Sequence, residues 1–180
     1  MAVDGGVNMV QLREKDLSDE VLLDLATELQ QVIQGRASLV INNRLNVALA
    51  CNADGVHLGE QDLVASAVRE IVGEDMIIGR SAHSLTGAIY AERHGADYVV
   101  IGSIFRTGSH PGVDPIGIEI LTKLRFDLKI PYIGIGGISD SNATDVVDEG
   151  ASGVAVMRSI LKSDDPKKAA QRIRTAVEGM

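Results

Sequence analysis

The sequence predicts an α/β fold of the TIM type, a barrel in which parallel strands alternate with helices. A small-residue corner followed by a short apolar strand recurs four times, at 5–10, 53–58, 95–101 and 150–156. Glycine supplies the positive φ that ends a helix, and short β-branched runs are typical of buried parallel strands. Each of these strands opens into a polar segment, which in α/β barrels indicates an active site at the carboxyl ends of the strands.

Seven strands are expected, with helices between them. The first helix spans Leu17 to Gln34, with Ser18 as its N-cap and Gly35 as its stop, and residues 1–6 resemble a helix tail. The expected strands are 7–12, 38–42, 55–58, 76–81, 97–102, 131–136 and 153–157. The further helices are 44–52, 63–72, 84–94, 116–125, 141–149 and 166–178. Because TIM barrels have eight βα units, the first unit is expected to be missing. An open doubly wound sheet is the alternative, although no Gly-x-Gly-x-x-Gly motif follows the first strand.

The composition favours a single domain spanning residues 1–180. Hydrophobic residues make up 45% of the chain and aromatic residues 3%, so the core is expected to consist of Val, Ile, Leu and Ala. A net charge of −8 argues against a nucleic-acid partner, which would need a basic face. The single Cys51 and the lack of any run of about 18 apolar residues indicate a cytoplasmic protein without membrane association.

Two adjacent glycines, Gly136 and Gly137, end one strand and precede a helix. Exposed backbone N–H groups and a helix N-terminus favour an anion there, and barrels commonly bind phosphate with their last two loops. The last strand ends at Met157 and Arg158, which would complete such a phosphate site. A tight turn without any ligand is the alternative for the glycine pair.

A charged segment follows the first strand. On an extended chain Gln11, Arg13 and Lys15 point to one side, whereas Leu12 and Glu14 point to the other. Two cations and an amide at a barrel mouth suit a second, highly charged anion such as a diphosphate. The alternative is a solvated strand end whose cations pair with neighbouring carboxylates, although an arginine inside an apolar barrel is costly without a partner.

Oxygen ligands follow the second and third strands. The carboxylate of Asp62 and the amides of Asn42 and Asn43 could hold Mg²⁺ bridged to a diphosphate, because Mg²⁺ keeps waters and takes few protein ligands. For Asn43 and Asp62 the competing interpretation is a helix cap.

Two histidines are candidates for function. His83, at the mouth of the fourth strand, is placed to exchange protons with a substrate, and a packed neutral imidazole is the alternative. His110, on the Gly/Pro-rich loop 105–115, is placed to cover a bound ligand. His57 and His94 are interpreted as structural.

Taken in order, these motifs resemble the thiamine-phosphate synthase family and its paralogue, the thiazole tautomerase TenI. The matching stretches cover nearly the whole chain: Gln-Leu-Arg-Glu-Lys-Asp at 11–16, Ile-Asn-Asn-Arg at 41–44, Ala-Asp-Gly-Val-His-Leu-Gly-Glu-Gln-Asp at 53–62, Ile-Gly-Arg-Ser-Ala-His-Ser at 78–84, Gly-Ala-Asp-Tyr at 95–98, Gly-Ser-Ile-Phe at 102–105 and Ile-Gly-Gly-Ile at 135–138. The resemblance implies an α/β barrel, usually a homodimer, that joins hydroxymethylpyrimidine diphosphate to a thiazole phosphate and releases pyrophosphate with Mg²⁺.

The resemblance also assigns residues to the two substrates and the metal. Those expected around the pyrimidine diphosphate are Gln11, Arg13, Lys15, Asn42 and Ser81, with Asp62 on Mg²⁺. Those expected around the thiazole phosphate are Thr107, Gly137 and the backbone near Met157 and Arg158.

Three motifs depart from the synthase pattern. Asn43 stands where the family has aspartate, so one metal carboxylate is lost. The family has Thr-x-Thr-Lys where this chain has Thr107, Gly108, Ser109 and His110. An imidazole therefore replaces a lysine near the diphosphate. Arg158 replaces a small hydroxyl residue. Losing a carboxylate and a lysine is expected to weaken binding of the metal and diphosphate by roughly 2–3 kcal/mol or more.

Three functions are therefore weighed. A synthase comes first, because Gln11, Arg13, Lys15 and Asp62 make chemical sense around a diphosphate and a metal. A TenI-like tautomerase, with His83 as acid and base in aromatising a carboxythiazole phosphate, is the second. A non-catalytic phosphate-ligand binding or regulatory protein is the third.

Overall fold

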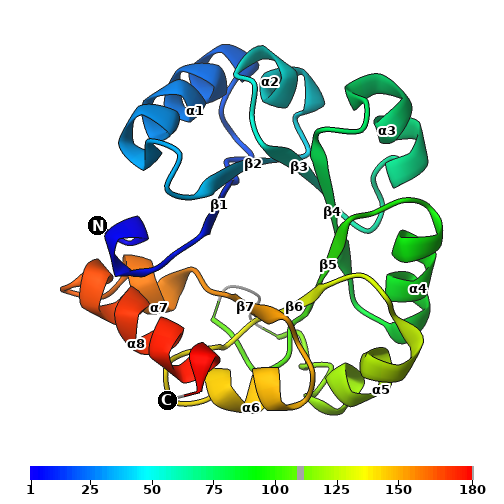
Figure 1. Cartoon of the computed structure of the whole chain (residues 1–180), viewed down its shortest axis with the longest axis vertical. Helices are drawn as coiled ribbons and strands as arrows, with labels where there is room; N and C mark the ends of the chain where they lie inside the picture. Colours follow the sequence, from blue (N-terminus) through cyan, green and yellow to red (C-terminus); the bar gives the residue numbers. More distant parts are fainter. Residues whose placement is uncertain (109–111, 180) are drawn as a thin grey trace.

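Within residues 1–108 and 112–179, which the computed structural model describes, the chain forms one sheet of seven parallel strands with helices outside it (Figure 1). Each strand pairs with the next one along the chain. The strands are β1 (Met9–Leu12), β2 (Ser38–Asn42), β3 (Gly55–Leu58), β4 (Ile77–Ala82), β5 (Tyr98–Gly102), β6 (Tyr132–Ile135) and β7 (Gly153–Ala155). The predicted TIM-type fold is confirmed, because every expected strand occurs in parallel pairing.

The helices follow the predicted alternation. Ser18 caps α1 (Asp19–Ile33), accepting a hydrogen bond of 3.4 Å from the backbone N–H of Val21, and Gln34 ends this helix with φ of 53°, one residue before the expected glycine. The helices of the described part are η1 (Val3–Gly5), α1 (Asp19–Ile33), α2 (Leu45–Ala50), α3 (Ala65–Val72), α4 (Leu85–Arg93), α5 (Glu119–Asp127), α6 (Ala143–Asp148), α7 (Arg158–Leu161) and α8 (Pro166–Glu178). η1 lies within residues 1–6, where the sequence predicts a helix tail. The expected helices do not include α7, because such a short helix shows no apolar periodicity.

β1 and β7 are the edges of the sheet, and they do not pair with each other in the described part of the chain. Instead η1, which precedes β1, packs against α8, and the backbone of Gly5 lies so close to Lys167 and Ala170 that no side chain would fit. Figure 1 shows one interruption of the ring, between β1 and β7, with η1 beside α8. The seven strands therefore correspond to a TIM-type barrel without one unit, as the sequence predicts.

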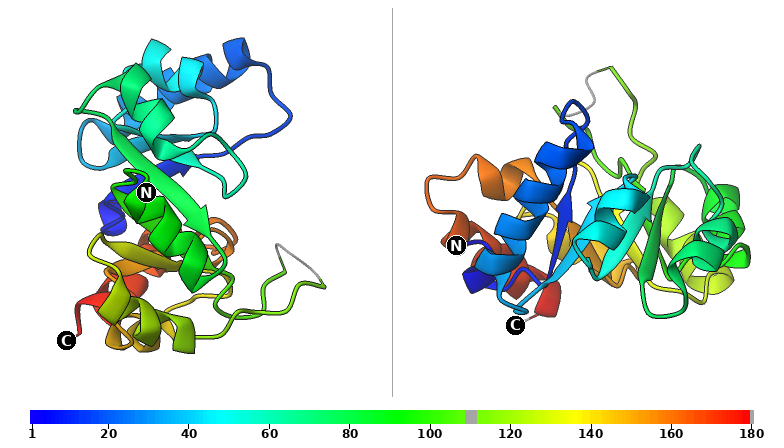
Figure 2. Two further views of the ribbon diagram at one scale, coloured as in Figure 1. Left: turned by 90° about the vertical axis from the view of Figure 1, so that its right-hand side faces the viewer. Right: turned by 90° about the horizontal axis from the view of Figure 1, so that it is seen from above.

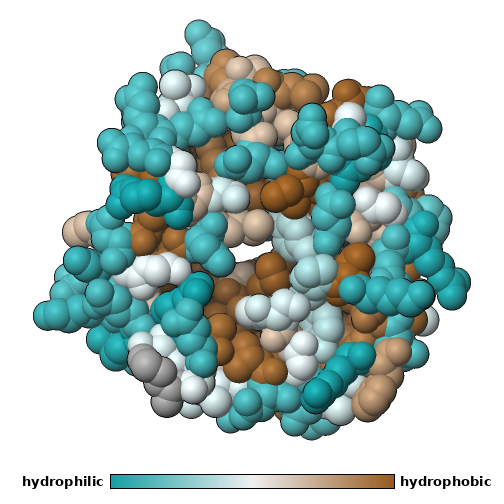
Figure 3. All heavy atoms as spheres, in the orientation of Figure 1, coloured by the Kyte–Doolittle hydropathy of each residue, from teal (hydrophilic) through white to brown (hydrophobic). Residues whose placement is uncertain are grey.

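The two faces of the sheet have different roles. The outer face packs under the helices in an aliphatic core that includes Leu12, Ile41, Val56, Ile78, Val99 and Ile101. The alternate residues face the inside of the ring, where the strand register aligns Asn42 with His57 and Gly79 with Tyr98. A Cβ atom on Gly79 would collide with the ring of Tyr98, so glycine here makes room for a tyrosine inside the ring. Figure 3 shows a narrow opening at the centre of the molecule.

The functional end of the barrel is the one at which the strands end. In both views of Figure 2 the loop 13–18 and the chain leading to residue 108 extend from the body toward this same end. Parallel strands bring all their following loops to one rim, so the polar segments predicted from the sequence share this rim. Within the described ranges, no helix has both the length and the apolar content that a membrane crossing requires.

Candidate active site

A buried histidine connects the inward-facing side chains of three neighbouring strands. His57 on β3 lies 2.9 Å through Nε2 from the hydroxyl of Ser81 on β4, and 3.2 Å through Nδ1 from the hydroxyl of Tyr98 on β5. His57 is 3% exposed, and burial is the main reason that its pKa falls to about 4. The imidazole is therefore neutral at pH 7. Asn42 on β2 adjoins it in register.

Charged residues from two rim loops act on this histidine. After burial, the carboxylate of Asp62 raises the pKa of His57, while the guanidinium groups of Arg13 and Arg80 lower it. Arg13 follows β1 and Asp62 follows β3, so both loops bring charge close to the imidazole. Gln11 pairs in register with Val40 of β2 and shares its face of the sheet. The structure thus brings Gln11, Arg13, Asn42, Asp62 and Ser81 to the strand ends of β1–β4.

The loop after β1 is held by an arginine from the next unit. Arg44 forms an ion pair with Asp19 at the start of α1, and it donates to the carbonyl oxygens of Lys15 at 3.4 Å and Leu17 at 3.3 Å. Asn46 donates to the other oxygen of the Asp19 carboxylate at 2.5 Å. These contacts fix the backbone of the segment that carries Lys15, whose side chain is exposed at the rim.

The two predicted metal ligands lie at neighbouring strand ends and do not cap helices. Asp62 accepts a hydrogen bond of 2.5 Å from the N–H of Gly59, whereas α3 begins at Ala65 without a side-chain cap. Asn43 is exposed with φ of 62°, and its N–H donates to the carbonyl of His57 at 2.9 Å. The capping interpretation is therefore wrong for both residues. Within residues 1–108 and 112–179, no three His, Cys, Asp or Glu side chains are grouped as metal ligands.

Arg80 is a buried cation at this end of the barrel, at 4% exposure. It lies on the outer face of β4, and its guanidinium donates to the carbonyl oxygens of Leu63 at 2.5 Å, Glu60 at 3.0 Å and Asp62 at 3.2 Å. A buried guanidinium needs such acceptors to offset its desolvation. Arg80 therefore fixes the backbone of the loop that carries both rim carboxylates.

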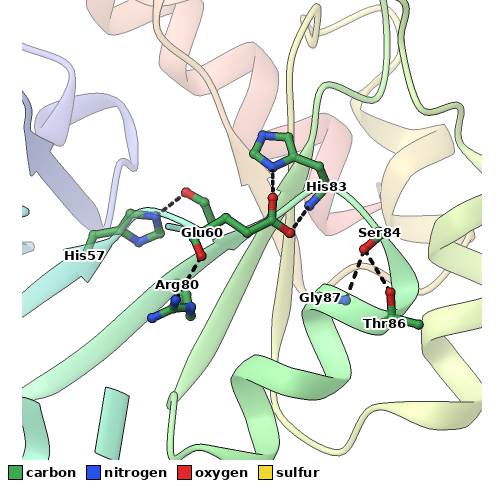
Figure 4. A network of polar contacts seen from close by, with 8 residues as sticks. His57, Glu60, Arg80, His83, Ser84, Thr86 and Gly87 are labelled. Carbon is green, nitrogen blue, oxygen red and sulfur yellow. Dashed lines mark hydrogen bonds and ion pairs between the residues drawn. The ribbon is translucent and has the colours of Figure 1, made fainter. Parts of the chain in front are cut away.

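Glu60 links this loop to His83. Its carboxylate accepts a hydrogen bond of 3.4 Å from the backbone N–H of His83 and lies 2.7 Å from Nδ1 of the same residue. Figure 4 shows Glu60 with Arg80 on its backbone side and His83 on its carboxylate side. The His83 side chain is 61% exposed, and Ser84 caps α4 through a 3.0 Å hydrogen bond from the N–H of Gly87. The alternative of a packed imidazole is therefore wrong, and His83 is a solvated partner of Glu60.

The glycine pair joins two rim loops. Gly136 and Gly137 have φ of 99° and 67°, and a Cβ atom on Gly136 would lie 2.5 Å from the Cβ of Ser103. The N–H of Phe105 donates to the carbonyl of Gly136 at 3.0 Å, which ties the loop after β5 to the loop after β6. The positive φ angles and the close packing therefore require glycine at both positions, whether or not a ligand binds there.

Thr107 and Arg158 come from different segments of the same region, a loop and a helix start. Thr107 is half-buried in the loop after β5, and the guanidinium of Arg158, from the start of α7, lies against Gly108. Met157 is exposed beside it. The predicted residues Ser109 and His110 lie outside the described residues.

Sequence reasoning missed several contributors to this end of the barrel. His57 was interpreted as structural only, and no role was assigned to Glu60, Arg80, Tyr98 or Arg44. Alternation offered a signal for His57, because Val56 and Leu58 on either side face the core. The other four depend on which strands and loops are neighbours, and that information comes from the fold.

The fold and the rim define a TIM-type α/β enzyme with a polar site at the carboxyl ends of its strands. The sequence profile described as thiamine monophosphate synthase matches residues 1–160, and the chain belongs to this family.

Named relatives agree with this assignment. A thiamine-phosphate synthase from Haloarcula marismortui is 42% identical over 98% of this chain and 86% of the relative. One from Clostridium botulinum is 44% identical over 96% of this chain and 85% of the relative. The solved structure of thiamine phosphate pyrophosphorylase from Pyrococcus furiosus superposes with a TM-score of 0.90 at 36% identity, covering 98% of this chain and 86% of that chain. The predictions of a synthase-family enzyme and of a transferase are confirmed, and the tautomerase is not supported.

Proposed function

We propose that this enzyme couples hydroxymethylpyrimidine diphosphate to a thiazole phosphate and releases pyrophosphate. The observation that carries the proposal is the convergence of Arg13, Asn42, Asp62 and Ser81 around one buried histidine at the strand ends. Asn42 and Ser81 lie in β2 and β4, and Arg13 and Asp62 lie in the loops that follow β1 and β3. A cation, an amide and a hydroxyl gathered in this way suit an anionic diphosphate better than a neutral ligand.

The reaction requires a good leaving group and a positioned nucleophile. The bond between the pyrimidine methylene carbon and the diphosphate oxygen breaks, the thiazole nitrogen forms the new C–N bond, and pyrophosphate leaves with the electron pair. Arg13 and Lys15 are proposed to neutralise the charge that develops on the leaving oxygen. Gln11, Asn42 and Ser81 are proposed to hold the diphosphate by hydrogen bonds, so that the methylene faces the thiazole.

The residues present fit Mg²⁺ held mainly by substrate. Asp62 supplies one carboxylate and Asn43 one exposed amide, which matches the small number of protein ligands that Mg²⁺ takes when phosphates complete its shell. The carboxylate of Asp62 is oriented by the N–H of Gly59, as a ligand needs to be. When bound, Mg²⁺ would neutralise charge on the diphosphate.

The thiazole phosphate is proposed to occupy the half of the rim built by β5–β7. Gly136, Gly137 and Thr107 belong to two loops that are hydrogen-bonded to each other. The start of α7 adjoins both loops, because Arg158 lies against Gly108 and the hydroxyl of Ser159 donates to the carbonyl of Ile138 at 2.5 Å. Backbone N–H groups at Gly137 and at Met157 and Arg158 would bind the phosphate. The two substrates would thus enter from opposite sides of β4 and meet at the centre of the rim.

The test is pyrophosphate release from both substrates with Mg²⁺, measured beside an incubation with the non-aromatic carboxythiazole phosphate alone. Pyrophosphate formed only when both substrates are present supports the proposal. An absorbance change in the second incubation without pyrophosphate in the first would indicate the tautomerase instead. Phosphate-ligand binding with no turnover in either would indicate a binding protein. A homodimer and a cytoplasmic location remain predictions from the family resemblance and the composition.

A further inference from the structure

The hydrogen bonds of Tyr98, His57 and Ser81 form a chain whose direction can be worked out. Tyr98 is 6% exposed. Within residues 1–108 and 112–179, Nδ1 of His57 is the one hydrogen-bond partner of the Tyr98 hydroxyl. A buried hydroxyl proton without an acceptor is costly, so the Tyr98 O–H donates to Nδ1. Nδ1 then carries no proton.

The proton of the neutral imidazole must therefore be on Nε2. From there it donates to the Ser81 oxygen 2.9 Å away, and that oxygen becomes an acceptor toward the histidine. The Ser81 hydroxyl proton is then not used in the bond to His57 and is available to a ligand, because Ser81 is half-buried. In the reverse direction Ser81 would donate to His57 and could offer a ligand only its lone pairs.

We propose that Tyr98 and His57 are positioning residues that fix Ser81 as a hydrogen-bond donor to the bound diphosphate. The inference rests on the proposed function for the identity of this anion. A donor at Ser81 attracts phosphate oxygens, whereas an acceptor would repel them.

The surroundings of His57 keep the chain neutral, as this direction requires. Burial lowers the pKa of His57 to about 4, and burial also raises the pKa of Tyr98, so both are neutral at pH 7. Among the charged groups, the carboxylate of Asp62 favours a charged imidazole, and the guanidinium groups of Arg13 and Arg80 oppose it, but burial is the largest effect and keeps the imidazole neutral. Protonation of His57 is therefore not part of the proposed function of this chain of hydrogen bonds.

The first test is the tautomer of His57, read at pH 7 from the side-chain ¹⁵N chemical shifts of the full chain with labelled histidine. The His57 signals are assigned by their loss in His57→Gln. We expect a protonated Nε2 and an unprotonated Nδ1. A proton on Nδ1 would overturn the proposal. This measurement needs no substrate, so it gives its answer even when the proposed synthase reaction is absent.

The second test compares Tyr98→Phe with Tyr132→Phe in the pyrophosphate assay. Tyr132 is a matched control, because it is equally buried and its hydroxyl donates to the carbonyl of Leu121 at 3.2 Å, on the outer face of the sheet. We expect Tyr98→Phe to raise KM for the diphosphate about tenfold, the worth of one hydrogen bond, with kcat changed less than twofold.

The thiazole-phosphate KM should stay constant in both variants, and the Tyr132→Phe enzyme should keep the wild-type diphosphate KM. Ser81→Ala combined with Tyr98→Phe should be no worse than Ser81→Ala alone, because Tyr98 is proposed to act only through Ser81. Equal diphosphate KM values in Tyr98→Phe and Tyr132→Phe, or additive losses in the double variant, would overturn the proposal. An inactive wild type with the expected tautomer would instead refute the synthase function.

Discussion

Replacing Arg80 by methionine tests whether this buried cation organises the loop of the rim carboxylates. The guanidinium makes three hydrogen bonds to the carbonyl oxygens of Glu60, Asp62 and Leu63, at 2.5–3.2 Å. Methionine keeps most of the apolar stem in the core while it removes all three donors. The carbonyl groups then depend on water, and the loop becomes free to move.

The cost can be worked out from these three contacts. An acceptor that loses its partner costs about 1–3 kcal/mol when it stays buried, and the low end applies here because Glu60 and Asp62 are half-buried and Leu63 is exposed. Three such losses give roughly 3 kcal/mol. The variant no longer buries a charged guanidinium, and this gain offsets any cost above that value. A chain of this size loses about 2–4 °C in Tm per kcal/mol, so Tm should fall by about 6–12 °C.

The assay combines thermal unfolding with a Mg²⁺ titration of pyrophosphate release. We expect the half-saturating Mg²⁺ concentration to rise about tenfold in Arg80→Met, which is the effect of disturbing one ligand's orientation. Arg69→Met is the matched control. Arg69 donates to the carbonyl oxygens of Gly73 at 2.9 Å and Met76 at 2.6 Å, in the loop that precedes β4 at the opposite end of the barrel.

Arg69→Met should lower Tm without changing the Mg²⁺ dependence, because no rim carboxylate lies on its loop. A lower Tm in Arg80→Met with an unchanged Mg²⁺ titration would refute the positioning role. Equal changes in the two variants would mean that general loss of stability, and not the orientation of Asp62, sets the response.

Three further predictions concern the same rim. Asn43→Asp should lower the half-saturating Mg²⁺ concentration severalfold in the same titration, because it restores the second metal carboxylate. The left-handed φ of 62° accommodates aspartate as well as asparagine. An unchanged Mg²⁺ dependence would remove Asn43 from the metal site. Arg13→Ala should abolish pyrophosphate release with little change in Tm, since Arg13 is exposed, whereas His83→Ala should retain it; near-normal turnover in Arg13→Ala would contradict the assignment. The pKa of His57 is about 4 when folded and about 6.5 when unfolded, so the unfolded chain binds more protons between these values. Stability should be complete above pH 6.5 and fall by up to roughly 3 kcal/mol toward pH 4, and urea unfolding should show this component missing in His57→Gln.

The fold was largely predictable because its signals are local. Glycine corners such as Gly95 and Gly150, both with positive φ, mark helix ends, and each following apolar run becomes a strand. The regular alternation of these signals leaves a parallel sheet as the consistent arrangement. Short helices such as α7 are not predictable in this way, because four residues do not establish a helical period.

The site was predictable only in part, because its contacts join residues that are distant in sequence. Alternation placed Gln11 and Arg13 on one side of the first strand, and the register of Gln11 with Val40 agrees with that side. The pairing of Glu60 with His83 instead depends on the loop after β3 lying against the end of β4. The pattern of the sequence says that both residues are polar and near strand ends, but it does not say that they meet.

β4 shows how closely the order of residues is tied to the chemistry of the rim. Successive side chains of a strand point to opposite faces, so Gly79 and Ser81 face the ring while Arg80 faces the helices. Gly79 leaves room for Tyr98, Ser81 meets His57, and Arg80 holds the loop of Asp62. A slip of one residue in the register would place the guanidinium inside the ring and the hydroxyl in the core, which would remove both arrangements at once. The Gly-Arg-Ser order is therefore a requirement of the site as much as of the sheet.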